Sequence, residues 1–159
     1  MKKIRIYTDG SSRGNPGNGG YGAVLEYTSP DGREYRKELS AGYRMTTNNR
    51  MELMGVIAAL EELTQPCEIE LFSDSQYIIN AFQEHWIDGW VRNGWKLSSK
   101  KPVKNVDLWK RLLADMEGHK IHWHWVKGHA GQTQNERCDA LATSAADGSR
   151  LKEDTGYRP

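Results

Sequence analysis

Residues 4–11 constrain the fold of this chain more than any other stretch, because they predict a buried β-strand that ends at an acid. By the strand's period of two, Ile4, Ile6 and Thr8 fall on one face. Asp9 falls on the opposite face and is followed by glycine. An acid in this position is often only a turn residue, so a chemical role for Asp9 depends on which other acids the chain brings near it.

Length and composition predict one folded domain over residues 1–147, followed by a polar, loosely held tail over residues 148–159. With 27% charged and 37% hydrophobic residues, the chain can bury a core and is not expected to be disordered. The absence of a long apolar run argues against a signal peptide and a membrane span. Cys67 and Cys138 form neither a disulfide framework nor a metal-ligand pair, so the expected location is the cytoplasm. The net charge of +1 gives no general case for nucleic acid, so any surface that binds it has to be local.

The order of the predicted elements indicates the α/β class, with a mixed five-stranded sheet and helices on both of its faces. The first three strands are expected to form an antiparallel meander, with a hairpin turn at residues 29–32. A glycine-rich loop is expected at residues 10–22 and an irregular segment at residues 85–105. The predicted strands cover residues 4–11, 21–27, 34–42, 68–73 and 121–126, and the predicted helices cover residues 50–63, 75–83, 107–117 and 133–146.

Four acids occupy positions that indicate a shared site. Asp9 and Asp74 each end a predicted strand, and in sheets with parallel members ligand sites gather at the carboxyl ends of strands. Glu52 and Asp139 each head a row of inward-facing residues on a predicted helix. Because a buried acid is costly unless a cation meets it, the four together predict a cation site.

Each acid also has a structural explanation that the sequence leaves open. Glu52 could be the third residue of a capping box that begins at Asn49, and Asp74 could cap the following helix. Asp139 could pair with Arg137 or with a lysine. Together these explanations still leave four inward acids without a comparable set of inward bases.

Carboxylate oxygens without cysteine or clustered histidine select hard cations, so the expected metal is Mg²⁺, with Mn²⁺ as a substitute, rather than Zn²⁺. Four such groups can hold two ions about 4 Å apart, an arrangement that serves phosphodiester hydrolysis. One ion lowers the pKa of the attacking water, and the other stabilises the leaving oxygen. His129 lies in a glycine-hinged loop shortly before Asp139, where it is either a surface residue or a group that transfers protons near the acids.

With these residues assembled, the chain resembles the bacterial type 1 ribonucleases H over nearly its whole length. The matching motifs follow the family's order and extend to residues 153–157 near the C-terminus. They are Tyr7-Thr8-Asp9-Gly10-Ser11, Gly14-Asn15-Pro16-Gly17, Thr46-Thr47-Asn48-Asn49-Arg50-Met51-Glu52-Leu53, Asp74-Ser75-Gln76-Tyr77, Trp125-Val126-Lys127-Gly128-His129-Ala130-Gly131 and Asn135-Glu136-Arg137-Cys138-Asp139.

The resemblance implies a metal-dependent endonuclease that cleaves the RNA strand of an RNA–DNA hybrid and leaves 5′-phosphate and 3′-hydroxyl ends. It implies that the four acids bind the metal ions, that Asp9 is shared by both ions, and that His129 aids proton transfer or product release. The hybrid is the expected partner, and the protein is expected to be a monomer. The residues implied to contact the hybrid are Asn15, Asn48, Asn49 and Gln76 at its minor groove, and Thr47 at a phosphate of the DNA strand. Amide side chains suit this role, because they can donate to and accept from the 2′-hydroxyls of RNA.

Residues 86–104 resemble the family's basic handle, because five basic residues against the single acid Asp88 give a local charge of +4. The candidate substrate contacts in this handle are Trp86, Arg92, Lys96, Lys100 and Lys101, and Lys104 is the fifth base. Trp86 and Trp90 are one helical turn apart, and hydrophobic packing is preferred to base stacking for both. A merely solvated face is the alternative for the lysines. Val91 and Asn93 stand where many relatives have a denser basic run.

Two other functions fit parts of this pattern. A different metal nuclease on the same fold, such as a Holliday-junction resolvase or a transposase core, would share the acids but not the amides Asn48, Asn49 and Gln76. A binding module for hybrids with an inactive site would not need four intact acids. Cleavage assays on matched duplexes distinguish all three.

Overall fold

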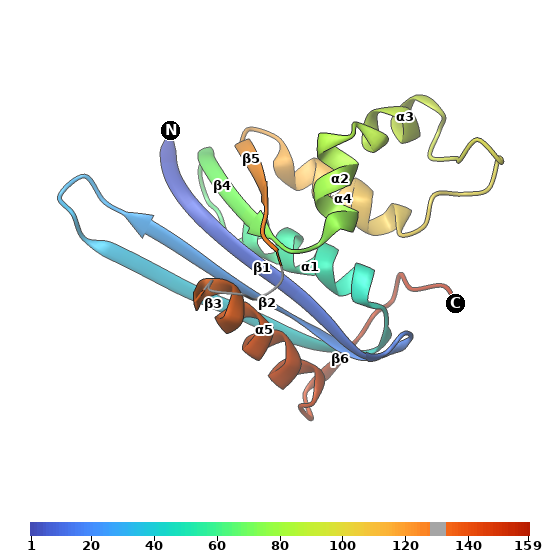
Figure 1. Ribbon diagram of the computed structural model, residues 1–159, viewed down its shortest axis with the longest axis horizontal. Coiled ribbons are helices and arrows are strands. Elements are labelled where there is room, and N and C mark those ends of the chain that lie inside the picture. Colours follow the sequence, from blue (N-terminus) through green and yellow to red (C-terminus); the bar gives the residue numbers. More distant parts are fainter. Residues whose placement is uncertain (128–132) are drawn as a thin grey trace.

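In residues 1–127 and 133–159, which a computed structural model describes, six strands form one mixed sheet in the order β5-β4-β1-β2-β3-β6 (Figure 1). The strands are β1 (Lys2–Gly14), β2 (Gly17–Thr28), β3 (Glu34–Thr46), β4 (Cys67–Ser73), β5 (Lys120–Trp125) and β6 (Leu151–Glu153). The helices are α1 (Asn48–Glu61), α2 (Gln76–Gln83), α3 (Trp86–Arg92), α4 (Val106–Met116) and α5 (Thr133–Ala146). The antiparallel meander β1–β2–β3 and the mixed α/β architecture predicted from the sequence are confirmed.

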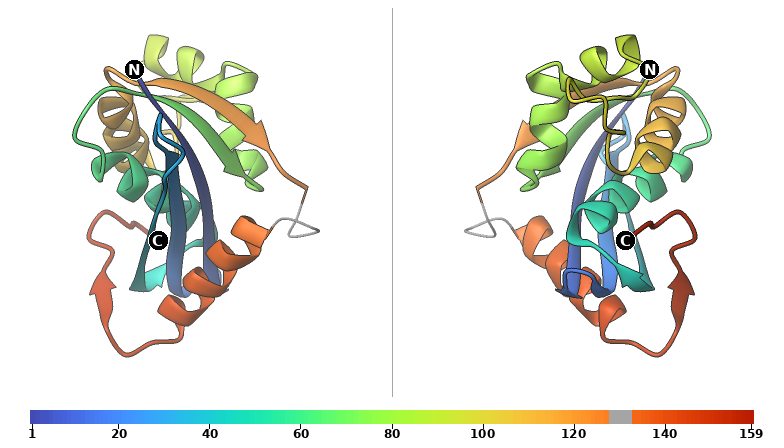
Figure 2. Two further views of the ribbon diagram at one scale, coloured as in Figure 1. Left: turned by 90° about the vertical axis from the view of Figure 1, so that its left-hand side faces the viewer. Right: turned by 90° about the vertical axis from the view of Figure 1, so that its right-hand side faces the viewer.

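Helices cover both faces of the sheet, and the two faces are unequal (Figure 2). On the α1 side, α1, α2 and α4 bury a large apolar core in which Ile6, Leu71 and Trp109 are fully enclosed. On the other side α5 packs against β1, β2 and β3 over a small cluster that includes Tyr7 and Cys138. The layered arrangement follows from the alternation along β1, where Ile4 and Ile6 face the large core and Tyr7 faces α5.

The glycine-rich loop expected at residues 10–22 is wrong, because β1 continues to Gly14 and β2 begins at Gly17. The glycines serve helix packing here. A Cβ on Gly10 would lie 2.9 Å from the Glu52 Cα in α1, and a Cβ on Gly22 would lie 2.7 Å from the Leu141 Cβ in α5. Strand glycines therefore let both helices approach the sheet closely. The loop prediction was wrong because it took these glycines as turn residues.

The predicted count of five strands is also wrong, because Leu151–Glu153 adds a sixth strand parallel to β3 at Gly42–Arg44. Three residues carry no detectable period, so this pairing left no sequence signal. The segment expected to be irregular contains the seven-residue helix α3. Its Ile87 is buried and Trp90 packs edge-on against Trp109 at 5.4 Å, so tertiary packing stabilises a short helix that its composition does not predict.

A buried ion-pair network ties the C-terminal segment to the start of α1. Arg50, with a side chain only 2% exposed, donates from Nε to Asp154 Oδ2 at 2.7 Å and from Nη2 to Asp107 Oδ2 at 2.7 Å. Thr46 Oγ1 donates to the same Asp154 oxygen at 2.7 Å. The expectation of a loosely held tail is therefore wrong for Leu151–Glu153 and Asp154.

Among the helices of residues 1–127 and 133–159, none combines the length and apolarity that a transmembrane span requires.

We predict that Asp154→Ala lowers the free energy of unfolding by about 3 kcal/mol, because it leaves the buried Arg50 guanidinium with Asp107 as its remaining carboxylate. The control is Glu153→Ala, which removes an ion pair to Arg44 between side chains that are 68% and 55% exposed and should change stability by less than about 1 kcal/mol. Urea unfolding of both variants provides the measurement. Equal effects would contradict a structural role for the network.

Candidate active site

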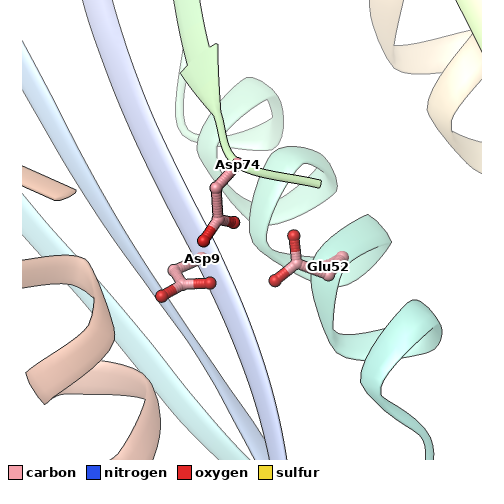
Figure 3. A group of neighbouring side chains, drawn as sticks. All are labelled: Asp9, Glu52 and Asp74. Carbon is pink, nitrogen blue, oxygen red and sulfur yellow. The ribbon is translucent and has the colours of Figure 1, made fainter. Parts of the chain in front are cut away.

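Three carboxylates meet near the C-terminal end of β4, beside the interior strand β1. Asp9 in β1, Asp74 directly after β4 and Glu52 in α1 each offer a carboxylate oxygen, and these atoms lie within 4.8 Å of one another (Figure 3). β1 and β4 pair in parallel, and their last paired residues are Thr8 and Ser73. Asp9 and Asp74 therefore follow equivalent positions on neighbouring strands. Parallel pairing is what places the two acids side by side, one residue beyond the last paired residues of these strands.

Glu52 lies beside the two aspartates because α1 packs against the Gly10 backbone. Its side chain is buried, and its Oε1 accepts the Gly10 N–H at 2.5 Å. The same N–H also lies 2.9 Å from Asp9 Oδ1, so one backbone donor serves two carboxylates. Glu52 Oε2 is buried with no hydrogen-bond donor among the described residues. The orphaned Glu52 Oε2 leaves room for a cation as its partner.

Burial raises the pKa of Glu52 well above its usual range, and the nearby charges of Asp9 and then Asp74 raise it further. The Gly10 N–H lowers it, but this effect is smaller. The cluster thus holds unfavourable charge that a bound cation would relieve. An all-oxygen donor set with one orphaned buried oxygen fits a hard divalent cation.

The acids form one wall of an open pocket of about 580 Å³. Asp139, half-exposed on α5, lines the same pocket, but it is not within the 4.8 Å group that Asp9, Glu52 and Asp74 form among the described residues. The structure therefore brings three of the four predicted acids into direct proximity and places the fourth at the pocket wall.

Two of the structural explanations that the sequence left open, the capping roles of Glu52 and Asp74, are wrong. The N-cap of α1 is Thr47, whose side chain accepts the Arg50 N–H, so a capping box from Asn49 to Glu52 does not form. Ser75 caps α2 by accepting the Ile78 N–H, so Asp74 is not its cap.

The arginine suggested for Asp139 makes a different ion pair. Arg137 donates from Nε and Nη2 to the two carboxylate oxygens of Glu38 at 2.8 and 2.9 Å. Arg137 is on α5 and Glu38 is on β3, so this ion pair joins the helix to the sheet.

Amide side chains surround the pocket on its open side. Asn48 and Asn49 begin α1 and Gln76 begins α2; all three line the pocket and are exposed. Asn15 lies in the turn between β1 and β2, and its Oδ1 accepts the Asn48 N–H at 3.2 Å. Asn15 and Thr47 do not line this pocket. They line a second, larger groove beside it, and Asn49 lines both.

The handle residues lie outside the pocket, on the projecting segment between α2 and α4 (Figure 1). Trp86 and Arg92 are on α3, and Trp86 is 43% exposed. The predicted packing role therefore describes Trp90, which contacts Trp109, better than Trp86. Lys96, Lys100 and Lys101 are exposed in the loop that follows.

Two further residues bear on the sequence prediction. His129 lies in residues 128–132, outside the described part of the chain. Trp125 was not predicted as a site residue, yet it lines the pocket and its Nε1 donates to the Asp74 carbonyl at 3.2 Å. Its sequence signals were its place near the end of a predicted strand and its position at the start of the motif over residues 125–131.

Comparisons with known proteins agree on one family. The RNase H family model matches residues 1–147. A ribonuclease H of Lachnoclostridium phytofermentans is 60% identical over 153 residues, which cover 96% of this chain and 97% of that protein. The crystal structure of LC9-RNase H1, a type 1 RNase H, superposes with a TM-score of 0.83 at 34% identity, over 92% of this chain and 72% of that one. LC11-RNase H1, solved in complex with an RNA/DNA hybrid, gives a TM-score of 0.61 at 27% identity, over 91% and 96%.

We predict that the metal-free protein loses stability relative to its Glu52→Gln variant as pH rises. The raised pKa means that folded Glu52 keeps a proton that the unfolded chain releases near its ordinary value of 4.5. The folded state therefore binds more protons in this interval, and its stability falls as pH rises from about 4.5 through the folded pKa. Glutamine keeps an acceptor for the Gly10 N–H but does not ionise.

Urea unfolding in EDTA at pH 5 and pH 8 measures this difference, with Glu34→Gln, an exposed change in β3, as the control. The free energy of unfolding of the wild type should fall further below that of Glu52→Gln at pH 8 than at pH 5. Adding Mg²⁺ should reduce this difference. A difference that is the same at both pH values would show that the cluster is not strained by charge.

Proposed function

The chain belongs to the ribonuclease H family of endoribonucleases, and from this premise we propose that it hydrolyses the RNA strand of RNA–DNA hybrids at the acid cluster. The observation that carries the proposal is the meeting of Asp9, Glu52 and Asp74 within 4.8 Å beside a pocket lined with amides. The relative LC11-RNase H1, solved with an RNA/DNA hybrid, supports the choice of substrate.

The residues that would hold the metal are Asp9, Glu52, Asp74 and Asp139, with Asp9 shared between two ions. When bound, two Mg²⁺ ions would supply an activated water and stabilise the leaving oxygen, giving 5′-phosphate and 3′-hydroxyl ends; Mn²⁺ is the proposed substitute. The buried Glu52 and the Gly10 N–H keep the cluster in a fixed geometry before metal binds. Asp139 lines the same pocket and is more exposed than Asp9 and Glu52. His129 is proposed to move a proton at the leaving or product oxygen.

Recognition of RNA is proposed to come from the amides. Asn48, Asn49 and Gln76 are exposed at the pocket, where they can pair with 2′-hydroxyls in a wide minor groove without reading base sequence. Asn15 supports this arrangement because its Oδ1 fixes the Asn48 backbone. Thr47 is proposed to contact a phosphate of the DNA strand.

The handle is proposed to bind the duplex backbone outside the active site. Arg92, Lys96, Lys100 and Lys101 are exposed, as phosphate contacts have to be, and Trp86 exposes enough of its ring to contact the duplex beside them. The protein is proposed to act as a monomer in a reducing cytoplasm, which suits its two buried free cysteines.

One assay tests the substrate assignment. Hybrid, double-stranded RNA and double-stranded DNA of the same sequence are incubated with the protein and Mg²⁺, and each labelled strand is resolved on a denaturing gel. Cleavage confined to the RNA strand of the hybrid is expected. Comparable cleavage of double-stranded DNA would favour the related metal nucleases, and hybrid binding without cleavage would indicate an inactive module.

We predict that Asp9→Asn reduces hybrid cleavage by at least about 10³-fold, equal to about 4 kcal/mol of barrier, because it removes the charge that both ions would share. The variant should fold, since the change keeps the side-chain volume and the acceptor for the Gly10 N–H. Asp31→Asn, in the exposed turn between β2 and β3, is the matched control and should retain wild-type activity. Single-turnover cleavage in Mg²⁺ is the measurement, and substantial activity in Asp9→Asn would refute the metal mechanism.

A further inference from the structure

A groove of about 940 Å³ lies beside the acid pocket and exceeds it in volume. Its walls are the β1–β2 turn, the start of α1, the handle exit at residues 101–106 and the C-terminal residues Gly156–Pro159. Figure 2 shows the C-terminal segment returning past α1 after β6. Asn49 lines both the groove and the acid pocket, so the two are adjacent parts of one surface.

The C-terminal wall of this groove is held in a fixed position. Asp154 is bound by the buried Arg50, and Leu151–Glu153 is paired with β3. Gly156 then passes so close to the Arg50–Asp107 ion pair that a Cβ there would lie 2.9 Å from Arg50 Nη2. The buried ion pair between Arg50 and Asp154 therefore fixes where the C-terminal residues 156–159 meet the groove.

The side chains that line the groove carry a net positive charge. Asp107 is the one acid among the described residues that line it, and both of its oxygens accept bonds from Arg50. Lys101, Lys104 and Arg158 are exposed and contribute three positive charges from two separate segments. Arg158 Nη1 donates to the Thr155 and Tyr157 carbonyls at 3.1 and 3.2 Å, which orients the guanidinium and leaves Nε and Nη2 to a ligand.

We propose that the C-terminal segment is part of the nucleic-acid interface and that Arg158 binds a backbone phosphate of the duplex in this groove. A guanidinium held by two backbone carbonyls is preorganised for a phosphate, and lysines on the opposite wall suit an extended polyanion better than a single small anion. The proposal rests on the proposed function, because it takes the duplex at the acid pocket to continue across Asn49 into the groove.

The test measures binding of a labelled hybrid to the full-length protein by fluorescence anisotropy in EDTA, between 50 and 200 mM KCl. Arg158→Ala should weaken binding about fivefold at 50 mM and reduce the slope of log affinity against log salt by about 0.9, the value for one phosphate contact. The difference from wild type should therefore shrink by about 3.5-fold at 200 mM. In Mg²⁺, kcat should be unchanged and KM raised.

Arg150→Ala is the matched control, because Arg150 is an exposed arginine that does not line the groove. It should leave the affinity and the salt slope unchanged. Arg158→Lys should keep the slope and lose part of the affinity, since it retains the charge without the planar fork. Thermal melts should coincide for all variants because the substituted side chains are exposed.

Unchanged binding in Arg158→Ala would overturn the proposal, because it would show that Arg158 makes no phosphate contact. An equal change of slope in Arg150→Ala would also overturn it, because it would show that net charge and not the position of Arg158 sets the affinity. The proposed function fails separately: a wild-type protein that binds the hybrid but cuts neither strand in Mg²⁺ would refute it, whatever the salt slopes show.

Discussion

The parallel pairing of β1 with β4 is the constraint on which the candidate site depends. It runs from Lys2 to Thr8 on one strand and from Cys67 to Ser73 on the other, and it ends where both strands deliver an aspartate. An antiparallel pairing of the same two strands would place Asp9 and Asp74 at opposite ends of the strand pair. Two helices complete the site: α1 supplies Glu52 from one side of the sheet, and α5 supplies Asp139 from the other.

The site is assembled against its own electrostatics. Burial and the neighbouring aspartates raise the pKa of Glu52, and one shared N–H from Gly10 does little to offset this. The rest of the fold therefore has to hold α1 in place against this unfavourable charge. The Arg50 network does so two residues away, joining the start of α1 to α4 and to the C-terminal segment. The acid cluster, in which charge is unfavourable, thus lies beside an ion-pair network in which the buried Arg50 guanidinium has carboxylate partners.

The site also depends on close contact between the helices and the sheet. Gly10 lets the backbone of α1 approach β1, and Gly22 lets α5 approach β2. A side chain at Gly10 would push away the helix turn that carries Glu52. The glycines in the first hairpin are therefore part of the site, although they carry no functional group.

The sequence by itself determined the chemical inventory: which acids are candidates for a shared site, which amides accompany them, and which motifs indicate the family. These are local properties, expressed in strand and helix periods that a single stretch of chain can reveal. Only the tertiary structure decided that Asp9, Glu52 and Asp74 converge while Asp139 stays at the wall, and that Asp154 anchors the tail. It also decided that the hairpin glycines lie in strands. Each of these outcomes depends on contacts between residues far apart in the chain, and such contacts leave no periodic signal for sequence reasoning to find.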